Sequence, residues 1–574
     1  MLFNSIEYLL FLPIVFLIYW AIGYAKIGDT LKLRLQNTFV VVASYVFYGW
    51  WDWRFLILIA FTSLCSWLSG ILINSTKTQI NPLRAINTDK EEVIKNTHST
   101  STMPDGPRGL ERNHPQTLTS ELAASVDANT PNMLPECSTL NAYENTSDSS
   151  DSEKCEKQDI DESRESREES VEWRVKRGKF WLWLNIAINI GILAVFKYYD
   201  FFVSEFGAML GINTSSLLLR VILPVGISFY TFQALSYSID VYRGNIKPTK
   251  DIIAFFTFIS FFPQLVAGPI ERATNLLPQF LQNRKFSYDQ GVDGMRQILW
   301  GLFKKIVIAD NCATYVDQVW STYGTQSGST LLLAAVLFTF QIYGDFSGYS
   351  DIAIGTAKLF GIKLMRNFNN PYFSRDIAEF WRRWHISLTS WFRDYVYIPL
   401  GGSRNGQWRT IANTFVVFML CAIWHGANWT YMVWGLYHVM LFIPLILIGR
   451  KREARPLDLD SLRTAFKMLL TFALVTIGLI IFRAPTVADA WGYVSAMCSS
   501  GWGLNYIGGV SSLAFTAIGI AVMMGMEWIQ RGEEHGLVLA GVASKVLRYA
   551  IYVVLIAMML WNGEQGDAFI YFQF

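Results

Sequence analysis

Apolar stretches recur along the 574-residue sequence and are separated by short polar segments. Many are close to twenty residues long, about the length that a helix needs to cross the hydrocarbon core of a bilayer. β-Barrel membrane proteins instead show shorter segments in which apolar and polar residues alternate, and the sequence lacks that pattern. It therefore predicts an all-α, polytopic membrane protein.

One segment departs from this pattern. Residues 75–172 carry 20 acidic and 10 basic side chains and a single aromatic residue, Tyr143. A segment of this composition buries too little apolar surface to offset the entropy of ordering it, so we predict a disordered spacer, with a regulatory or partner-binding role as the alternative. The sequence thus divides into N-terminal transmembrane helices at 1–74, an acidic low-complexity insertion at 75–175, and a transmembrane core with C-terminal helices at 176–574.

The apolar runs give the positions of the expected helices. Before the insertion we predict spans near 6–24, 36–51 and 54–73; the first is interpreted as a retained helix and the second is short for a full span. After it we predict helices near 180–206, 216–241, 252–267, 296–316, 330–356, 411–427, 429–449, 465–483, 512–530 and 546–561.

Some of these helices carry residues that break regular structure. Apolar runs are interrupted by Pro224, by Pro263 with Gly268 and Pro269, and by the glycines around Gly344 and Gly348. Irregular backbone at membrane depth is tolerated where it is buried in protein or lines a cavity, so we predict broken helices at these places.

The stretch 376–394 has a different pattern, that of one amphipathic helix that lies at the membrane interface or caps a funnel. Its polar face carries charged and hydroxyl side chains, which exclude a span that faces lipid. Its other face combines apolar residues with a histidine: Trp381, Trp384, His385, Leu388, Trp391 and Phe392.

Charge and composition predict a membrane topology and argue against several classes of function. Charged residues make up 16% of the chain, against about 25% in soluble proteins. Basic clusters at 26–34 and 174–179 flank spans and predict a cytoplasmic insertion with the N-terminus outside. The six cysteines are scattered, so we predict no disulfide framework and no metal site. Nothing in the sequence supports nucleic-acid binding.

Two histidines are the candidate catalytic residues. The ten residues before His425 carry no charge, and an imidazole at membrane depth must face protein or water. His385 lies forty residues upstream, within the amphipathic stretch. The alternative for each is structural: His425 as a buried, hydrogen-bonded histidine, and His385 as a cap of a helix end.

Several motifs in order resemble the membrane-bound O-acyltransferase family, in particular its branch of bacterial alginate and polysaccharide O-acetyltransferases. They are FFPQLVAGPI at 261–270, FQIYGDFSGYSDIAIG at 340–355, NNPYF at 369–373, EFWRRWH at 379–385, FRDYVYIPLGG at 392–402 and IWHGANW at 423–429. The resemblance covers nearly all of the chain except the insertion.

This resemblance implies a core of about eleven transmembrane helices, with broken, re-entrant and interfacial helices and with cytoplasmic and outer funnels. It implies acyl transfer from a cytoplasmic thioester, with His425 as the general base that activates an acceptor hydroxyl. His385 is expected to orient His425, to polarise the thioester carbonyl or to protonate the leaving thiolate.

Other polar and aromatic residues of the motifs are candidates for binding the donor. For the polar side chains of 345–351, buried hydrogen bonds that hold the fold are an equal alternative. The arginines are candidates for phosphate contacts and, alternatively, determinants of topology or lipid contacts. The set is Asp345, Ser347, Tyr349, Asp351, Trp384, Arg382, Arg383, Arg393, Trp424 and Asn428, with Arg404 as a further arginine.

The resemblance also implies partners. The donor is acetyl-CoA or an acyl-carrier thioester, with no tightly bound cofactor. The acceptors are a periplasmic SGNH-type acetyltransferase and a polysaccharide synthesis and export complex, in a bacterial inner membrane. D-alanyl transfer to a teichoic-acid-type polymer is an alternative, and a non-enzymatic transporter or flippase is an alternative of another class.

The insertion provides the first testable prediction. Deleting residues 80–170 is expected to leave the melting temperature in detergent and the acyl-transfer activity nearly unchanged, because the segment contributes no packed core. Loss of activity at normal expression would instead indicate that a carrier or regulator docks there.

Overall fold

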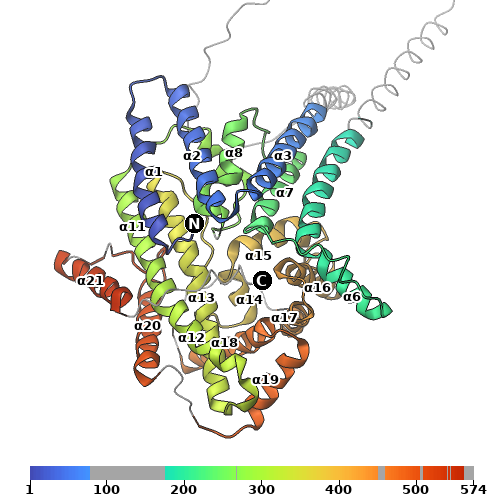
Figure 1. The fold of residues 1–574 in the computed structure, drawn as a ribbon, viewed down its shortest axis with the longest axis vertical. Helices are drawn as coiled ribbons and strands as arrows, with labels where there is room; N and C mark the ends of the chain where they lie inside the picture. The colour runs from blue at the N-terminus through green and yellow to red at the C-terminus, as the bar shows by residue number, and fades with distance from the viewer. Residues whose placement is uncertain are drawn as a thin grey trace, which may run out of the picture. The chain divides into compact units, whose positions relative to one another are not determined.

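The computed structural model describes residues 1–77, 173, 175–266, 268–449, 459, 461–503, 509–539, 541–542 and 544–561, without the side chains of 75–77. All regular elements in these ranges are helical (Figure 1). The predicted insertion at 75–175 falls almost wholly outside them, so its boundaries and its disorder stay predictions.

Seven of the described helices are long and apolar enough to cross a membrane, which agrees with the predicted all-α polytopic class. They are Ile6–Tyr24, Phe55–Asn74, Val175–Lys197, Gly328–Leu359, Trp429–Leu447, Leu462–Arg483 and Val510–Ile529.

The first three helices lie where they were predicted. They are α1 (Ile6–Tyr24), α2 (Asp29–Asp52) and α3 (Phe55–Lys77). Helix α2 begins seven residues before the predicted span, at Asp29, and its first turns are exposed or half-buried. Within the predicted span, the buried Asn37 side-chain amide donates to the Phe280 carbonyl at 2.8 Å.

Two helices predicted as single runs are divided or shortened. The run predicted at 180–206 breaks at Tyr198 into Val175–Lys197 and α6 (Tyr199–Leu210). Helix α7 (Ile227–Arg243) begins after Gly226, whose φ of 73° lies in the left-handed region. The helix predicted at 216–241 therefore starts about three turns late.

Three short helices follow. The first two, α8 (Ile252–Ser260) and α9 (Phe262–Leu265), divide the run predicted at 252–267. Pro263 lies in the first turn of α9. Proline is tolerated in that position because the first amides of a helix have no partner within it. After α9 the chain continues into α10 (Ala273–Phe280).

The helix predicted at 296–316 is three segments: α11 (Tyr288–Phe303), a π-helical turn (Lys304–Ala309) and α12 (Asp310–Ser321). The helix α13 (Gly328–Leu359) then runs antiparallel to α11 without a break. The prediction of a break around Gly344 and Gly348 is therefore wrong.

The glycines of α13 allow close helix contact instead. A Cβ on Gly348 would lie 2.8 Å from the Gly301 carbonyl oxygen, and a Cβ on Gly355 would lie 2.5 Å from that of Gly294. The two pairs are spaced by seven residues on both helices, so the backbones touch twice along one seam. Small residues permit this kind of approach between membrane helices.

The π-helical turn places two lysines against carboxylates of α13. The Lys304 ammonium lies 2.5 Å from Asp351, and that of Lys305 lies 2.7 Å from Asp345 and 2.8 Å from Asp310. Charges can be buried at this depth when they are paired in this way.

The stretch predicted as one amphipathic helix at 376–394 is two short helices, α14 (Ile377–Arg383) and α15 (Ile386–Phe392), followed by a π-helical turn (Arg393–Tyr397). The break falls on His385, whose φ is 44°. The single-helix prediction is wrong here, because the amide of Ile386 donates to the carbonyl of Asn367 at 2.8 Å rather than continuing α14.

The remaining helices are α16 (Gly406–His425), α17 (Trp429–Leu447), α18 (Leu462–Arg483), α19 (Val487–Ser499), α20 (Val510–Ile529) and α21 (Lys545–Trp561). Helix α19 was not predicted, since it has no long apolar run. Its N-terminal signal was present: Thr486 caps it by accepting from the Asp489 amide at 3.1 Å.

The glycine seam generates a prediction. Gly348→Ala should lower the free energy of unfolding by about 1–3 kcal/mol, because the new methyl group forces α11 and α13 apart. Gly191→Ala is the matched control, since a Cβ there meets nothing within 4 Å. Thermal melting in detergent measures both variants; equal melting temperatures would contradict the seam.

Candidate active site

His385 is held at the junction of α14 and α15 by Asn367. Its Nδ1 lies 3.1 Å from the side-chain oxygen of Asn367, which also accepts from the Ser387 amide at 3.3 Å and hydroxyl at 2.9 Å. The amide nitrogen of Asn367 donates to the Ser350 hydroxyl on α13 at 3.2 Å. Asn367 therefore connects the histidine to α13.

These hydrogen bonds determine the tautomer of His385. A backbone amide can only donate, so the Asn367 atom that faces Ser387 is the oxygen. His385 must then carry its proton on Nδ1, and Nε2 is the acceptor atom of the neutral ring. Burial lowers the pKa of His385 to about 3, so the ring is neutral at physiological pH.

His425 is the last residue of α16 and is buried in an aromatic cage. Its ring lies 5.1 Å from that of Phe482 and 5.3 Å from that of Trp434, measured between centroids. Gly426 follows in extended backbone, and a Cβ there would lie 2.4 Å from the Tyr431 ring. The glycine of the Trp-His-Gly motif thus lets the chain turn away directly after the histidine.

One tryptophan joins the two histidines. The Trp424 ring lies 5.0 Å from that of His425 and 5.8 Å from that of His385. The structure therefore brings His385, at the junction of α14 and α15, beside Trp424, which directly precedes His425 on α16. The Trp384 ring packs elsewhere, against Phe368 at 5.1 Å and Phe380 at 5.4 Å.

The polar residues of α13 divide into two groups. Asp345 pairs with Lys305, and Tyr349 donates to the Asn4 side chain at 3.0 Å, so both take part in packing contacts. Ser347 and Asp351 line a cavity of about 20 Å³, room for about one water molecule, which Asn367 also lines.

The predicted arginines also divide. Arg383 lies 2.9 Å from Glu379, which Arg375 contacts at 2.8 Å. Although burial opposes the shift, hydrogen bonds from these two arginines lower the pKa of Glu379 to about 2. Arg382 and Arg393 are exposed, as is Arg404. Asn428 has a structural position: it caps α17 by accepting from the Thr430 amide at 3.0 Å.

Two cavities reach Ile386, the residue after His385. One, of about 460 Å³, is lined by Arg382, Arg393 and apolar residues of α16. The other, of about 530 Å³, is lined by Arg393 and by two arginines that the sequence analysis missed, Arg243 and Arg272.

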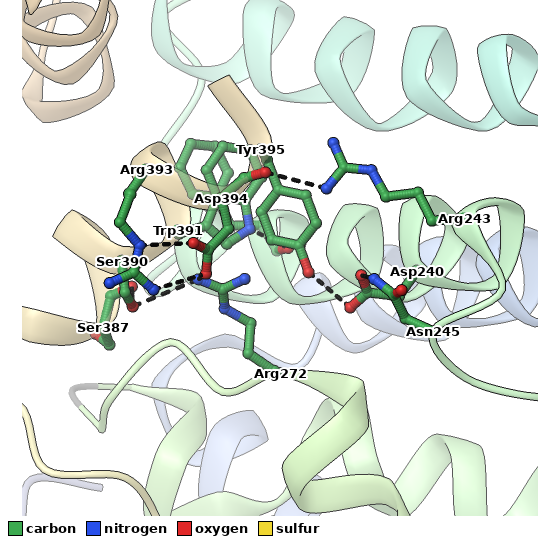
Figure 2. A network of polar contacts seen from close by, with 11 residues as sticks. Asp240, Arg243, Asn245, Arg272, Ser387, Ser390, Trp391, Arg393, Asp394 and Tyr395 are labelled. Atoms are coloured by element: carbon green, nitrogen blue, oxygen red, sulfur yellow. Dashed lines mark hydrogen bonds and ion pairs between the residues drawn. The ribbon is translucent and has the colours of Figure 1, made fainter. Parts of the chain in front are cut away.

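Figure 2 shows how Asp394 organises the arginines of the second cavity. Its carboxylate lies 2.7 Å from Arg393 and 3.1 Å from Arg272, and its carbonyl accepts from Arg243 at 3.0 Å. The hydroxyl of Tyr395 donates to Asp240 at 2.6 Å. The cavity can therefore offer several cationic donors to an anionic group.

The missed residues were difficult to find in the sequence. Asn367 and Lys197, a lysine beside Trp424, have no motif around them that indicates their contacts. Arg243 and Arg272 follow apolar segments and resemble ordinary flanking charges. A lysine at the end of an apolar run, as Lys197 is, was the one available signal.

The hydrogen bonds of Asn367 with His385 and Ser387 generate a prediction. Asn367→Ala should lower the free energy of unfolding by about 1–3 kcal/mol, because it leaves the buried Nδ1–H of His385 and the Ser387 amide without their acceptor. Asn283→Ala, at an exposed asparagine, should cost less than about 0.5 kcal/mol. Thermal unfolding measures both variants; equal losses of stability would show that the hydrogen bonds of Asn367 do not stabilise the fold.

The model of the membrane-bound O-acyltransferase family matches residues 246–458. A probable alginate O-acetylase of Pseudomonas aeruginosa is 40% identical over 336 residues, 58% of this chain and 63% of the relative.

Two further relatives are similar over comparable lengths. A probable alginate O-acetylase of Azotobacter vinelandii is 38% identical over 356 residues, 61% of this chain and 69% of the relative. A peptidoglycan O-acetyltransferase of Helicobacter pylori is 35% identical over 339 residues, 54% of this chain and 63% of the relative. The matches thus span somewhat under or just over two thirds of these relatives. Together they show that this chain belongs to the membrane-bound O-acyltransferase family.

Proposed function

We propose that this protein transfers an acyl group, acetyl in the simplest case, from a cytoplasmic thioester toward the O-acetylation of an exported polysaccharide. The observation that carries the proposal is the pair of buried histidines from separate helices, joined by Trp424. The alginate and peptidoglycan relatives support a polymer as the final acceptor and leave its identity open.

In this mechanism His425 takes the proton from the acceptor hydroxyl. The oxygen attacks the thioester carbonyl, the new C–O bond forms as the C–S bond breaks, and His425 returns the proton to the leaving thiolate. A buried neutral imidazole suits this role because it offers a lone pair.

The tautomer of His385 favours one of its three predicted roles. Polarising a carbonyl and protonating a thiolate both need an N–H at Nε2, and Asn367 holds the proton on Nδ1. An Nε2 lone pair instead suits accepting a hydrogen bond, from the acceptor hydroxyl or from the His425 ring. We therefore assign His385 the task of orienting the base or its substrate.

The remaining groups are assigned by position. The cavities at Ile386 fit the donor, and Arg243, Arg272 and Arg393 fit phosphates of coenzyme A or of a carrier's prosthetic arm. The acyl group then passes to a periplasmic SGNH-type acetyltransferase that works with the polysaccharide export machinery. The protein would do this in the inner membrane, with the insertion in the cytoplasm.

D-alanyl transfer from a carrier protein is the alternative within the same chemistry. The segment 398–402, IPLGG, favours the polysaccharide branch. A transporter or flippase would also contain buried polar residues, but it gives no reason for two buried histidines to pack against one tryptophan.

Mutation of the base tests the function. His425→Ala should abolish transfer of labelled acetyl to polymer in membranes while leaving the protein folded, with a loss of at least about 10²-fold. His114→Ala, in the insertion, is the matched control and should retain full activity. Persistent acetylation in a well-expressed His425→Ala variant would refute the assignment, and a wild-type protein that transfers D-alanine alone would establish the alternative.

A further inference from the structure

Lys197 ends the span Val175–Lys197 beside the candidate base, and the reaction described above does not use it. Its ammonium donates to the carbonyl of Trp424, the residue before His425, at 2.8 Å. Among the described residues it has no carboxylate partner. An ionisable side chain at membrane depth without a counter-ion is expensive, and such residues usually serve function.

Lys197 acts together with its neighbour. The Tyr198 hydroxyl donates to the carbonyl of Ile423 at 2.6 Å. Two consecutive residues thus satisfy two consecutive carbonyls in the last turn of α16. The carbonyls in the last turn of a helix have no amide partners within that helix, and α16 ends at His425. Lys197 and Tyr198 supply donors to two of them.

Burial opposes the charged form of Lys197, and two contacts favour it. The last turn of a helix carries partial negative charge, which attracts a cation. The ammonium also lies 5.9 Å from the centre of the Trp424 ring, within the range of a cation–π interaction. Both contacts compensate in part for the missing counter-ion.

We propose that Lys197 is a positioning residue for His425. By capping the carbonyl of Trp424 it holds the last turn of α16, and its charge disfavours a second charge on the neighbouring imidazole. The proposal rests on His425 acting as the base of the proposed function.

The other groups around His425 decide how strong this effect can be. The titratable groups that face it are His385, before α15, Lys197, and Tyr431 of α17; its remaining neighbours are Trp424, Trp434 of α17 and Phe482 of α18. Burial disfavours the imidazolium of His425 most, and His385 and Lys197 disfavour it further.

The test separates the charge of Lys197 from its hydrogen bond. Lys197→Gln keeps a donor for the Trp424 carbonyl but removes the charge, and Lys197→Arg keeps both. Tyr198→Phe removes a cap without changing charge, and Lys250→Met is an exposed control. Full-length variants in detergent are treated with diethylpyrocarbonate, which modifies neutral imidazole, and labelling of His425 is measured by mass spectrometry at about pH 5 and about pH 7.

We expect wild type, Lys197→Arg, Tyr198→Phe and Lys250→Met to label His425 about equally at the two pH values. Lys197→Gln should label less at the lower pH, because its imidazole protonates there. In acetyl transfer, Lys197→Gln and Tyr198→Phe should lower kcat more than they raise KM, by up to about 10²-fold for a displaced base.

Three results would overturn the proposal. They are equal labelling in Lys197→Gln at both pH values, the same loss in Lys197→Arg as in Lys197→Gln, or no labelling of His425 in wild type at either pH. A wild-type protein that transfers no acyl group refutes the proposed function instead, and the labelling experiment still decides the role of Lys197.

Discussion

The close crossing of α11 and α13 is the constraint on which the centre of this molecule depends. Two glycine pairs let the backbones touch, and the π-helical turn after α11 then carries Lys304 and Lys305 into contact with carboxylates of α13. With its charges neutralised, α13 can remain one long buried helix. Another part of its surface binds the segment before α14, through the hydrogen bond between Ser350 and Asn367. The position of His385 therefore follows from helix packing.

Both histidines stand at helix ends, where backbone groups need partners from elsewhere. His385 precedes the first residue of α15, and His425 is the last residue of α16. At each place a side chain distant in sequence supplies the partner, Asn367 in one case and Lys197 in the other. The site is consequently assembled from contacts between segments, and its geometry depends on the packing of the whole core.

The sequence predicted the features that depend on neighbouring residues and missed those that depend on long-range contacts. Spans such as α1, α17 and α18 follow from apolar length, and the histidine pair follows from motifs. The break at His385 could not be predicted from periodicity, because the residues on either side keep helical spacing while a long-range hydrogen bond ends the helix. Gly348 was misinterpreted for a similar reason: a glycine in a helix can break it or admit a neighbour, and the choice depends on what lies opposite. Asn367 lacked any local signal, and the one signal for Lys197 was its place at the end of an apolar run.

The backbone of His385 has a consequence for how this position can be studied. A φ of 44° is left-handed, a conformation that costs most residues about 1–2 kcal/mol and that histidine and asparagine adopt more readily than others. An alanine there would combine loss of the imidazole with backbone strain, so its phenotype could not be attributed to chemistry alone. Asparagine would remove the ring while tolerating the same turn. Both the role of the imidazole and the left-handed backbone therefore favour histidine at position 385.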